Sequence, residues 1–290
     1  MEPSSFASAT QQEQKRLPCN RAGSDQEIRI SEFFVDKEKL HYKGLVVQRL
    51  RKRIKIDEGQ QTFITANASY VVLRRHGTTV RKFDGISHPW GNGADFGLFA
   101  LLGGESKQLI VSLDVFRGGS QWVVELSKSA HVIYDGRAWG TGRESDDMGI
   151  VDLDNDGVCE ITVPITDFYE FQDKLPIARI PLPEIVFKYD PRAKKYLPAN
   201  PLFQDYLLDS FKGETQHLTP PDDRFGHLAD IMSIVLDLIF AGKETEAWAF
   251  FDHSYQLPDK KEISARMRTT LLHNQVYRFI YRRGSARRRK

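Results

Sequence analysis

The chain has 290 residues, of which 40% are hydrophobic and 28% are charged. This is the composition of a globular protein, so a wholly disordered chain, a collagen and a low-complexity fibre are excluded. A length prior of about 150 residues per domain predicts one or two domains.

Basic residues gather at the C-terminal end of a nearly neutral chain. The formal net charge is +2, from 41 basic and 39 acidic residues, and residues 282–290 hold six basic groups and no acidic one. Without these residues the formal charge is −4, so we expect a mildly acidic body and a basic tail. Nucleic acid is an unlikely partner for the body. The tail could contact nucleic acid or anionic lipid, or serve as a solubilising terminus.

The cysteines and the apolar runs exclude several classes of protein. Cys19 and Cys159 are too few for a disulfide framework, and neither lies in the CxxC spacing of a thiolate zinc site. No apolar run approaches the roughly 20 residues of a membrane span. Residues 1–14 lack the features of a signal peptide, so localisation stays open.

The first part of the chain is expected to be an arm followed by strands. Residues 1–26 are rich in Ser, Gln and charge, which predicts a disordered arm. From residue 27 to residue 215, β-branched and aromatic residues alternate with polar ones between Gly and Asp turns, which is typical of antiparallel strands. We expect strands at 27–31, 53–57, 69–74, 79–83, 108–116, 121–126, 131–134, 161–165 and 184–189.

The period of the pattern changes after Pro220-Pro221. Apolar residues then recur at the three- and four-residue spacing of amphipathic helices, with short connections between the segments. We expect helices over 228–239, around 247–251 and over 260–273, with Asp259 as the cap of the third, and a last short helical turn over 277–280.

These patterns predict a mainly β fold with a small α-helical C-terminal appendage. The antiparallel strands are expected to form an open sheet stack, a sandwich or a partial propeller-like array, because the β region is too short for six or seven four-stranded blades. The expected units are a disordered arm (1–26), a β domain (27–215), a helical segment (222–281) and a basic tail (282–290).

One segment carries a candidate metal site. Residues 152–163 read Asp-Leu-Asp-Asn-Asp-Gly-Val-Cys-Glu-Ile-Thr-Val. Three aspartates at alternate positions turn toward one centre when the backbone curls, and the glycine permits the positive φ of such a curl. Hard oxygen ligands of this kind suit Ca²⁺. The expected ligands are the side chains of Asp152, Asp154, Asp156 and Glu160 and the backbone carbonyl of Val158, with water completing the coordination.

Two other interpretations of this segment compete with a calcium loop. A solvated acidic turn needs the same Asp, Asn and Gly residues. An EF-hand needs helical flanks and a glutamate at loop position twelve, but Val163 stands there and the flanks predict strands, so the EF-hand is rejected. Cys159 is expected to be an inert thiol turned away from the ligands.

The motif resembles the calcium loop of FG-GAP/VCBS repeats, which occur in integrin-type β-propeller blades and in many bacterial surface proteins. In that family the loop joins two antiparallel strands, and its ligands stand at loop positions one, three, five, seven and nine. These positions match the five expected ligands of the 152–163 segment. Residues 146–198 agree loosely with the whole repeat, and 187–196 match its closing hairpin. The resemblance implies a calcium-binding, non-catalytic protein with a structural or recognition role.

A second, upstream unit is possible. Residues 99–116 can be laid beside residues 151–168, with Leu-Gly-Gly-Glu at 102–105 in place of the acidic loop. This similarity predicts either a degenerate repeat without a metal site or a coincidence.

The sequence offers no catalytic residues of a known motif. GxSxG, the P-loop and HExxH are absent. The alternative function is a hydrolase acting on glycans or phosphoesters through an acidic, metal-dependent site. A third possibility is an adaptor that grips a partner with an apolar groove across Leu228–Phe251. The partner of the favoured recognition protein is expected to be a protein or a glycan, and only the calcium loop suggests an extracytoplasmic location.

Overall fold

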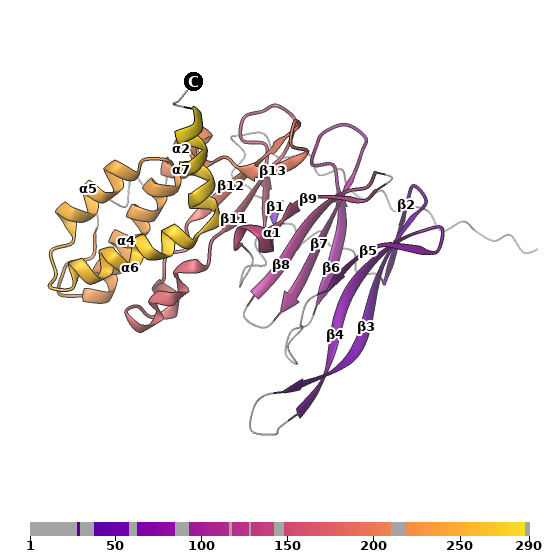
Figure 1. The fold of residues 1–290 in the computed structure, drawn as a ribbon, viewed down its shortest axis with the longest axis horizontal. Helices are drawn as coiled ribbons and strands as arrows, with labels where there is room; N and C mark the ends of the chain where they lie inside the picture. Colours follow the sequence, from indigo (N-terminus) through magenta and orange to yellow (C-terminus); the bar gives the residue numbers. More distant parts are fainter. Residues whose placement is uncertain are drawn as a thin grey trace, which may run out of the picture.

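The computed structural model describes residues 28–29, 38–57, 63–84, 93–115, 118–127, 129–141, 148–209 and 218–287. The arm expected over 1–26 lies outside the described residues, and of the strand expected at 27–31 only β1 (Ile28–Arg29) is described. Three antiparallel sheets are stacked, and helices cover one end of the stack (Figure 1). The fold is therefore mainly β with a helical C-terminal part, as the sequence predicts.

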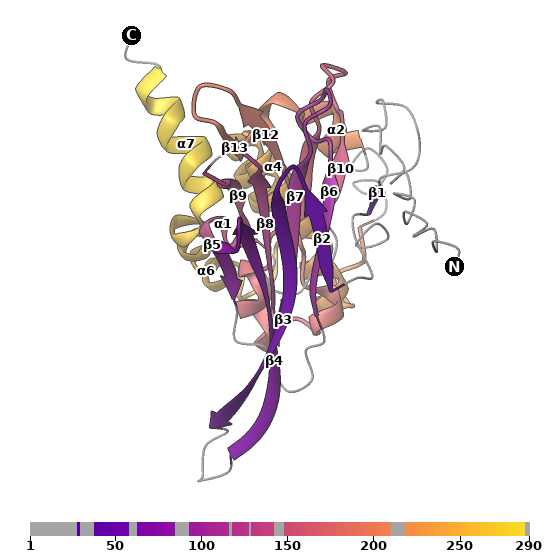
Figure 2. The same ribbon diagram turned by 90° about the vertical axis from the view of Figure 1, so that its right-hand side faces the viewer.

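The first sheet is a meander of four strands that follow one another in the chain. The strands expected at 69–74 and 79–83 are present and pair as a hairpin, and the turn residues His76 and Gly77 between them both have positive φ (49° and 80°). The paired strands β3 and β4 are long and extend well beyond the other sheets (Figure 2). The strands are β2 (Lys39–Tyr42), β3 (Leu45–Asp57), β4 (Phe63–Arg75) and β5 (Thr78–Asp84).

The second sheet lies between the other two and is buried on both faces. Alternate residues of its second strand point to opposite sides, so Leu109 and Val111 join the core shared with the first sheet, whereas Ile110 joins the core shared with the third. This arrangement explains the near-continuous apolar run at 109–111. The strands are β6 (Ala94–Phe99), β7 (Gln108–Val115), β8 (Gly118–Glu125) and β9 (His131–Asp135), and the short helix α1 (Gly136–Trp139) follows.

The third sheet adds one N-terminal strand to a four-stranded meander. Its order is β1-β10-β11-β12-β13, with all neighbours antiparallel. Tyr134 of the second sheet meets Phe187 of this sheet edge to face, with ring centroids 5.1 Å apart. The expected closing hairpin is confirmed as β12 and β13. The strands after β1 are β10 (Gly149–Val151), β11 (Glu160–Pro164), β12 (Glu184–Asp190) and β13 (Lys195–Pro198).

The C-terminal helices include the expected ones and several that the sequence pattern did not reveal. The helix expected over 260–273 has those bounds in the structure. The last helix is much longer than the single turn expected, and it continues through Arg287 into the segment assigned to a basic tail. The helices are α2 (Gln204–Asp209), α4 (Arg224–Phe240), α5 (Glu244–Ser254), α6 (Lys260–His273) and α7 (Gln275–Arg287), with 3₁₀ turns η2 (Asp167–Asp173), η3 (Ile177–Arg179) and η4 (Asn200–Leu202).

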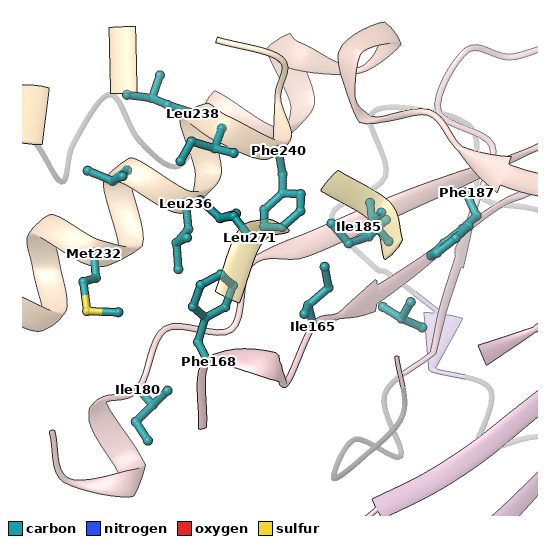
Figure 3. Close-up of a cluster of buried hydrophobic side chains, with 14 of the residues drawn as sticks. Ile165, Phe168, Ile180, Ile185, Phe187, Met232, Leu236, Leu238, Phe240 and Leu271 are labelled. Atoms are coloured by element: carbon teal, nitrogen blue, oxygen red, sulfur yellow. The ribbon is translucent and has the colours of Figure 1, made fainter. Parts of the chain in front are cut away.

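The helices share a hydrophobic core with the third sheet. Phe168 and Ile185 pack with Met232, Phe240 and Leu271 in one buried cluster (Figure 3). From Leu228 to Phe240 the large apolar residues of α4 are buried in this core, although Phe225 before them is 52% exposed. The apolar groove that an adaptor function would need across Leu228–Phe251 is therefore filled by the protein's own core. None of the described helices is both long enough and apolar enough to cross a membrane.

Asp259 has the position expected of a helix cap but does not cap the helix with its side chain. Asp259 stands at the N-cap position of α6, but its side chain makes no capping hydrogen bond. Its carboxylate instead accepts hydrogen bonds from Arg224 at 2.6 Å and from the Tyr255 hydroxyl at 3.0 Å. These side-chain donors take the place of the backbone amides of α6, and the bond from Arg224 ties α4 to α6.

Candidate functional site

The acidic segment forms the loop between the first and second strands of the third meander. Strands β10 and β11 pair at Gly149↔Thr162, Ile150↔Ile161 and Val151↔Glu160, so residues 152–159 close the turn. Asn155 and Gly157 have positive φ (58° and 83°), which curls the backbone. The two antiparallel flanks expected from the sequence are thus present.

Asp152 holds the curl together from inside. Its side chain is buried, with one carboxylate oxygen accepting from the amide of Asp156 at 3.1 Å and the other from the amide of Gly157 at 3.0 Å. The Asp156 carboxylate in turn accepts from the amide of Val158 at 2.8 Å. These bonds hold the carboxylates of Asp152 and Asp156 in place without a ligand.

The three aspartates are brought together as the sequence predicts. One carboxylate oxygen of each of Asp152, Asp154 and Asp156 lies within 4.8 Å of the others, a grouping that could hold a metal ion. Glu160 is fully buried beside them, and one of its oxygens accepts from the amide of Leu153 at 2.8 Å. The expected contribution of the Val158 carbonyl stays a prediction.

A lysine that sequence reasoning missed lies among these acids. Lys188 of β12 donates from Nζ to Asp154 Oδ2 at 2.8 Å, to Asp156 Oδ2 at 2.7 Å and to Glu160 Oε1 at 3.0 Å. It stands next to Phe187, which pairs with Ile161 on the neighbouring strand, so the sheet register places it opposite the loop. The alternating pattern at 184–189 predicts a strand, and only the register of that strand against β11 shows that Lys188 lies opposite the loop.

The lysine and the acids alter one another's protonation. Burial alone would lower the pKa of Lys188, but hydrogen bonds to Asp154, Asp156 and Glu160 outweigh it and raise that pKa above its ordinary value. The bond from Lys188 lowers the pKa of Asp156. Burial raises the pKa of Glu160, and the Leu153 amide and Lys188 offset only part of that rise. The ammonium therefore stays charged and stabilises the ionised loop.

The second sheet contains a loop of equal length in the equivalent place, over residues 100–107 between β6 and β7. Gln108 begins β7 as Glu160 begins β11, and its buried Oε1 accepts from the amide of Leu101 at 2.7 Å, as Glu160 does from Leu153. Gly103 has the positive φ (72°) that Asn155 has in the acidic loop. The upstream loop thus occupies the same place in its sheet as the acidic loop does, and the neutral amide of Gln108 stands where the acidic loop has the carboxylate of Glu160.

The two loops also touch each other. The amide of Cys159 donates to the carbonyl of Leu101 at 2.7 Å. A Cβ added to Gly103 would lie 2.9 Å from the carbonyl oxygen of Gly157, so only glycine fits there. The acidic loop is therefore supported by its neighbour as well as by its own strands.

The expectation of an inert thiol at Cys159 is wrong. Cys159 is disulfide-bonded, and its side chain is buried in the core shared by the second and third sheets. The chain has one other cysteine, Cys19, which lies outside the described residues.

Comparison with known protein families, curated proteins and solved structures finds no match to this chain.

Proposed function

We propose that this is a non-catalytic β protein whose β10–β11 loop binds one Ca²⁺ ion, with a structural or recognition role of the FG-GAP/VCBS type. The observation that carries the proposal is the convergence of the Asp152, Asp154 and Asp156 carboxylates within 4.8 Å, in a loop that joins two antiparallel strands. Carboxylate oxygens so placed are the donors that calcium prefers.

The charge balance of the loop favours a further cation. Four carboxylates face a single ammonium, which leaves a formal charge of −3 around Lys188. Lys188 makes no described bond to Asp152, so one of the three clustered aspartates is not neutralised by it. Mutual repulsion of the remaining charges opposes folding, and a divalent cation removes that cost.

Lys188 and calcium draw on the same carboxylates. The lysine side chain is 23% exposed, so its head can turn to water while its stem stays against the sheet. The free energy of calcium binding is then the free energy of the ion's contacts with the loop, reduced by the free energy needed to release this ammonium. The structure supports a loop that is held by Lys188 without calcium and by calcium when the ion is abundant.

The disulfide of Cys159 agrees with such a setting. Disulfides persist in oxidising compartments, and weak calcium loops with a Kd of about 0.1 mM are useful where calcium is near 1 mM, which is also outside the cytosol. At these values binding adds about 1.4 kcal/mol to the free energy of unfolding. The ion would stabilise the loop without being needed for the fold.

The alternative function, a hydrolase of glycans or phosphoesters, has less support. It requires a nucleophile and a base beside the acids. The partners described for the four carboxylates are backbone amides and Lys188, which are contacts that hold a loop.

Isothermal titration of the full chain with calcium tests the proposal. We expect one site in the wild-type protein, and a loss of at least tenfold in affinity for Asp154→Asn, because a charged ligand becomes neutral. Asp222→Asn is the matched control, since Asp222 is an exposed acid in the turn before α4 and its change should leave the affinity unaltered. Equal effects of both variants, or no binding by the wild type up to 10 mM calcium, about a hundredfold above the expected Kd, would contradict it.

A further inference from the structure

The first sheet carries a large excess of positive charge. Residues 38–84 contain eleven Lys and Arg residues and four acidic ones, a formal charge of +7 in a chain whose total is +2. The net charge of −4 expected for the body without the tail is therefore an average over a strongly basic first sheet and a more acidic remainder. The charge is segregated along the molecule, since the remaining residues together carry −5.

Most of these cations are open to solvent. Two exposed acids lie near them, with Glu38 3.8 Å from Arg51 and Asp84 2.8 Å from Lys82. Such solvent-exposed ion pairs are weak, so a phosphate can displace the carboxylate. Figures 1 and 2 show no labelled element against the face of this sheet that turns away from the second sheet. The exposed basic residues are Lys39, Lys43, Arg51, Lys52, Arg81 and Lys82.

The charge continues onto the protruding part of the sheet. Beyond Arg49, which is bonded to Asp95 of the second sheet, strand β3 carries basic residues at positions 51, 52, 53 and 55. The β4 residues paired with them (Ser69, Ala68, Asn67 and Thr65) are uncharged. Arg51 and Lys52 are adjacent and both exposed, so they point to opposite faces of the strand. The β3–β4 pair is thus a two-stranded ribbon with cations on both faces, and it extends clear of the other sheets (Figure 2).

We propose that the β3–β4 ribbon and the basic face of the first sheet bind the phosphate backbone of duplex DNA without sequence specificity. A two-stranded ribbon fits the major groove, which is about 12 Å wide and has phosphates on both walls. Cations on both faces of a ribbon match these two walls, whereas a flat anionic membrane would meet only one face. A second copy of the chain is disfavoured because it would bring two basic sheets together.

Fluorescence anisotropy of a labelled 20-base-pair duplex, titrated with the full chain in a salt series, tests this inference. We expect binding at about 50 mM salt that weakens linearly on a plot of log affinity against log salt. Arg51→Gln/Lys52→Gln should lower the slope by about 2 and weaken binding at least tenfold, because each residue neutralises about one phosphate.

Two matched variants and two probes make the test decisive. Arg192→Gln/Lys261→Gln removes two exposed cations far from the first sheet and should leave binding unchanged. Replacing the six basic residues of 282–290 with Gln should also preserve it. The inference is overturned if the wild type does not bind the duplex, if the tail variant alone abolishes binding, or if either control matches the Arg51/Lys52 variant. Binding to anionic vesicles or heparin without binding to the duplex would also overturn it.

Discussion

Replacement of Lys188 by methionine removes the ammonium from the acidic loop and keeps most of the side-chain volume. Asp154 and Asp156 are 41% and 44% exposed, so water replaces their lost bonds at little cost. Glu160 is fully buried, and its Oε1 loses its charged partner, which costs about 1–3 kcal/mol. We therefore expect Lys188→Met in chelator to lower the free energy of unfolding by about 2 kcal/mol and the melting temperature by about 4–8 °C.

Calcium should rescue this variant more than it helps the wild type. Without Lys188 no ammonium has to be released, so the loop binds the ion more tightly, and saturation to a hundred times Kd adds about 2.7 kcal/mol. Urea and thermal unfolding of both proteins, with and without calcium, measure the difference. Lys261→Met, which changes an exposed lysine on α6, is the control and should behave as the wild type.

Two outcomes would refute this reasoning. If Lys188→Met is equally destabilised in calcium and in chelator, the ion does not replace the ammonium. If the variant is as stable as the wild type in chelator, Lys188 does not hold the loop, and the acidic segment is a solvated turn.

Three further predictions concern the support of the loop, the helical end and the disulfide. Gln108→Leu removes the acceptor for the Leu101 amide, so urea unfolding should show a loss of about 1–3 kcal/mol that is independent of calcium; a calcium-dependent loss would speak against the equivalence of the two loops. Although burial raises the pKa of Asp259, hydrogen bonds from Arg224 and Tyr255 lower it overall, so its stabilisation is present above the unfolded pKa of about 3.9 and is lost as pH falls through the folded pKa. Asp259→Asn should flatten the dependence of unfolding free energy on pH below about 5, and an unchanged slope would show that the contact is not coupled to folding. Thiol titration of the unfolded chain without reductant should find no free thiol, whereas a reactive Cys159 would contradict the disulfide.

Local pattern was sufficient for much of the fold. The strands on either side of His76-Gly77 could be predicted because their residues alternate at period 2 and the turn between them is short, so they pair with each other locally. The helix at 260–273 could be predicted because Ile263, Met267 and Leu271 recur at helical spacing and are buried in one core, whereas Leu272 is 64% exposed. Helix α2 was missed because it is short and buries none of its residues, so its pattern has no apolar stripe. The extension of α7 was missed because polar, basic residues gave no reason to continue it.

Only the part of the candidate calcium site that lies in one continuous loop could be predicted from the sequence. The spacing of Asp152, Asp154 and Asp156 is a property of one continuous loop, and their convergence follows from the curl. The contact of Lys188 with Glu160 joins residues 28 positions apart, and it depends on the register of β11 against β12. The contact between the loops at 100–107 and 152–159 is of the same long-range kind. The basic charge of the first sheet, by contrast, was visible in the sequence at 49–55 and was obscured by averaging over the whole body.

The most direct test of a shared cation site follows the Lys188 ammonium itself. In protein labelled with ¹⁵N-lysine, an ammonium held by three carboxylates should give a protected NH₃⁺ signal in chelator that is absent from Lys188→Met. This signal should disappear as calcium is added, with a midpoint equal to the calorimetric Kd. A signal that persists unchanged at millimolar calcium would contradict it.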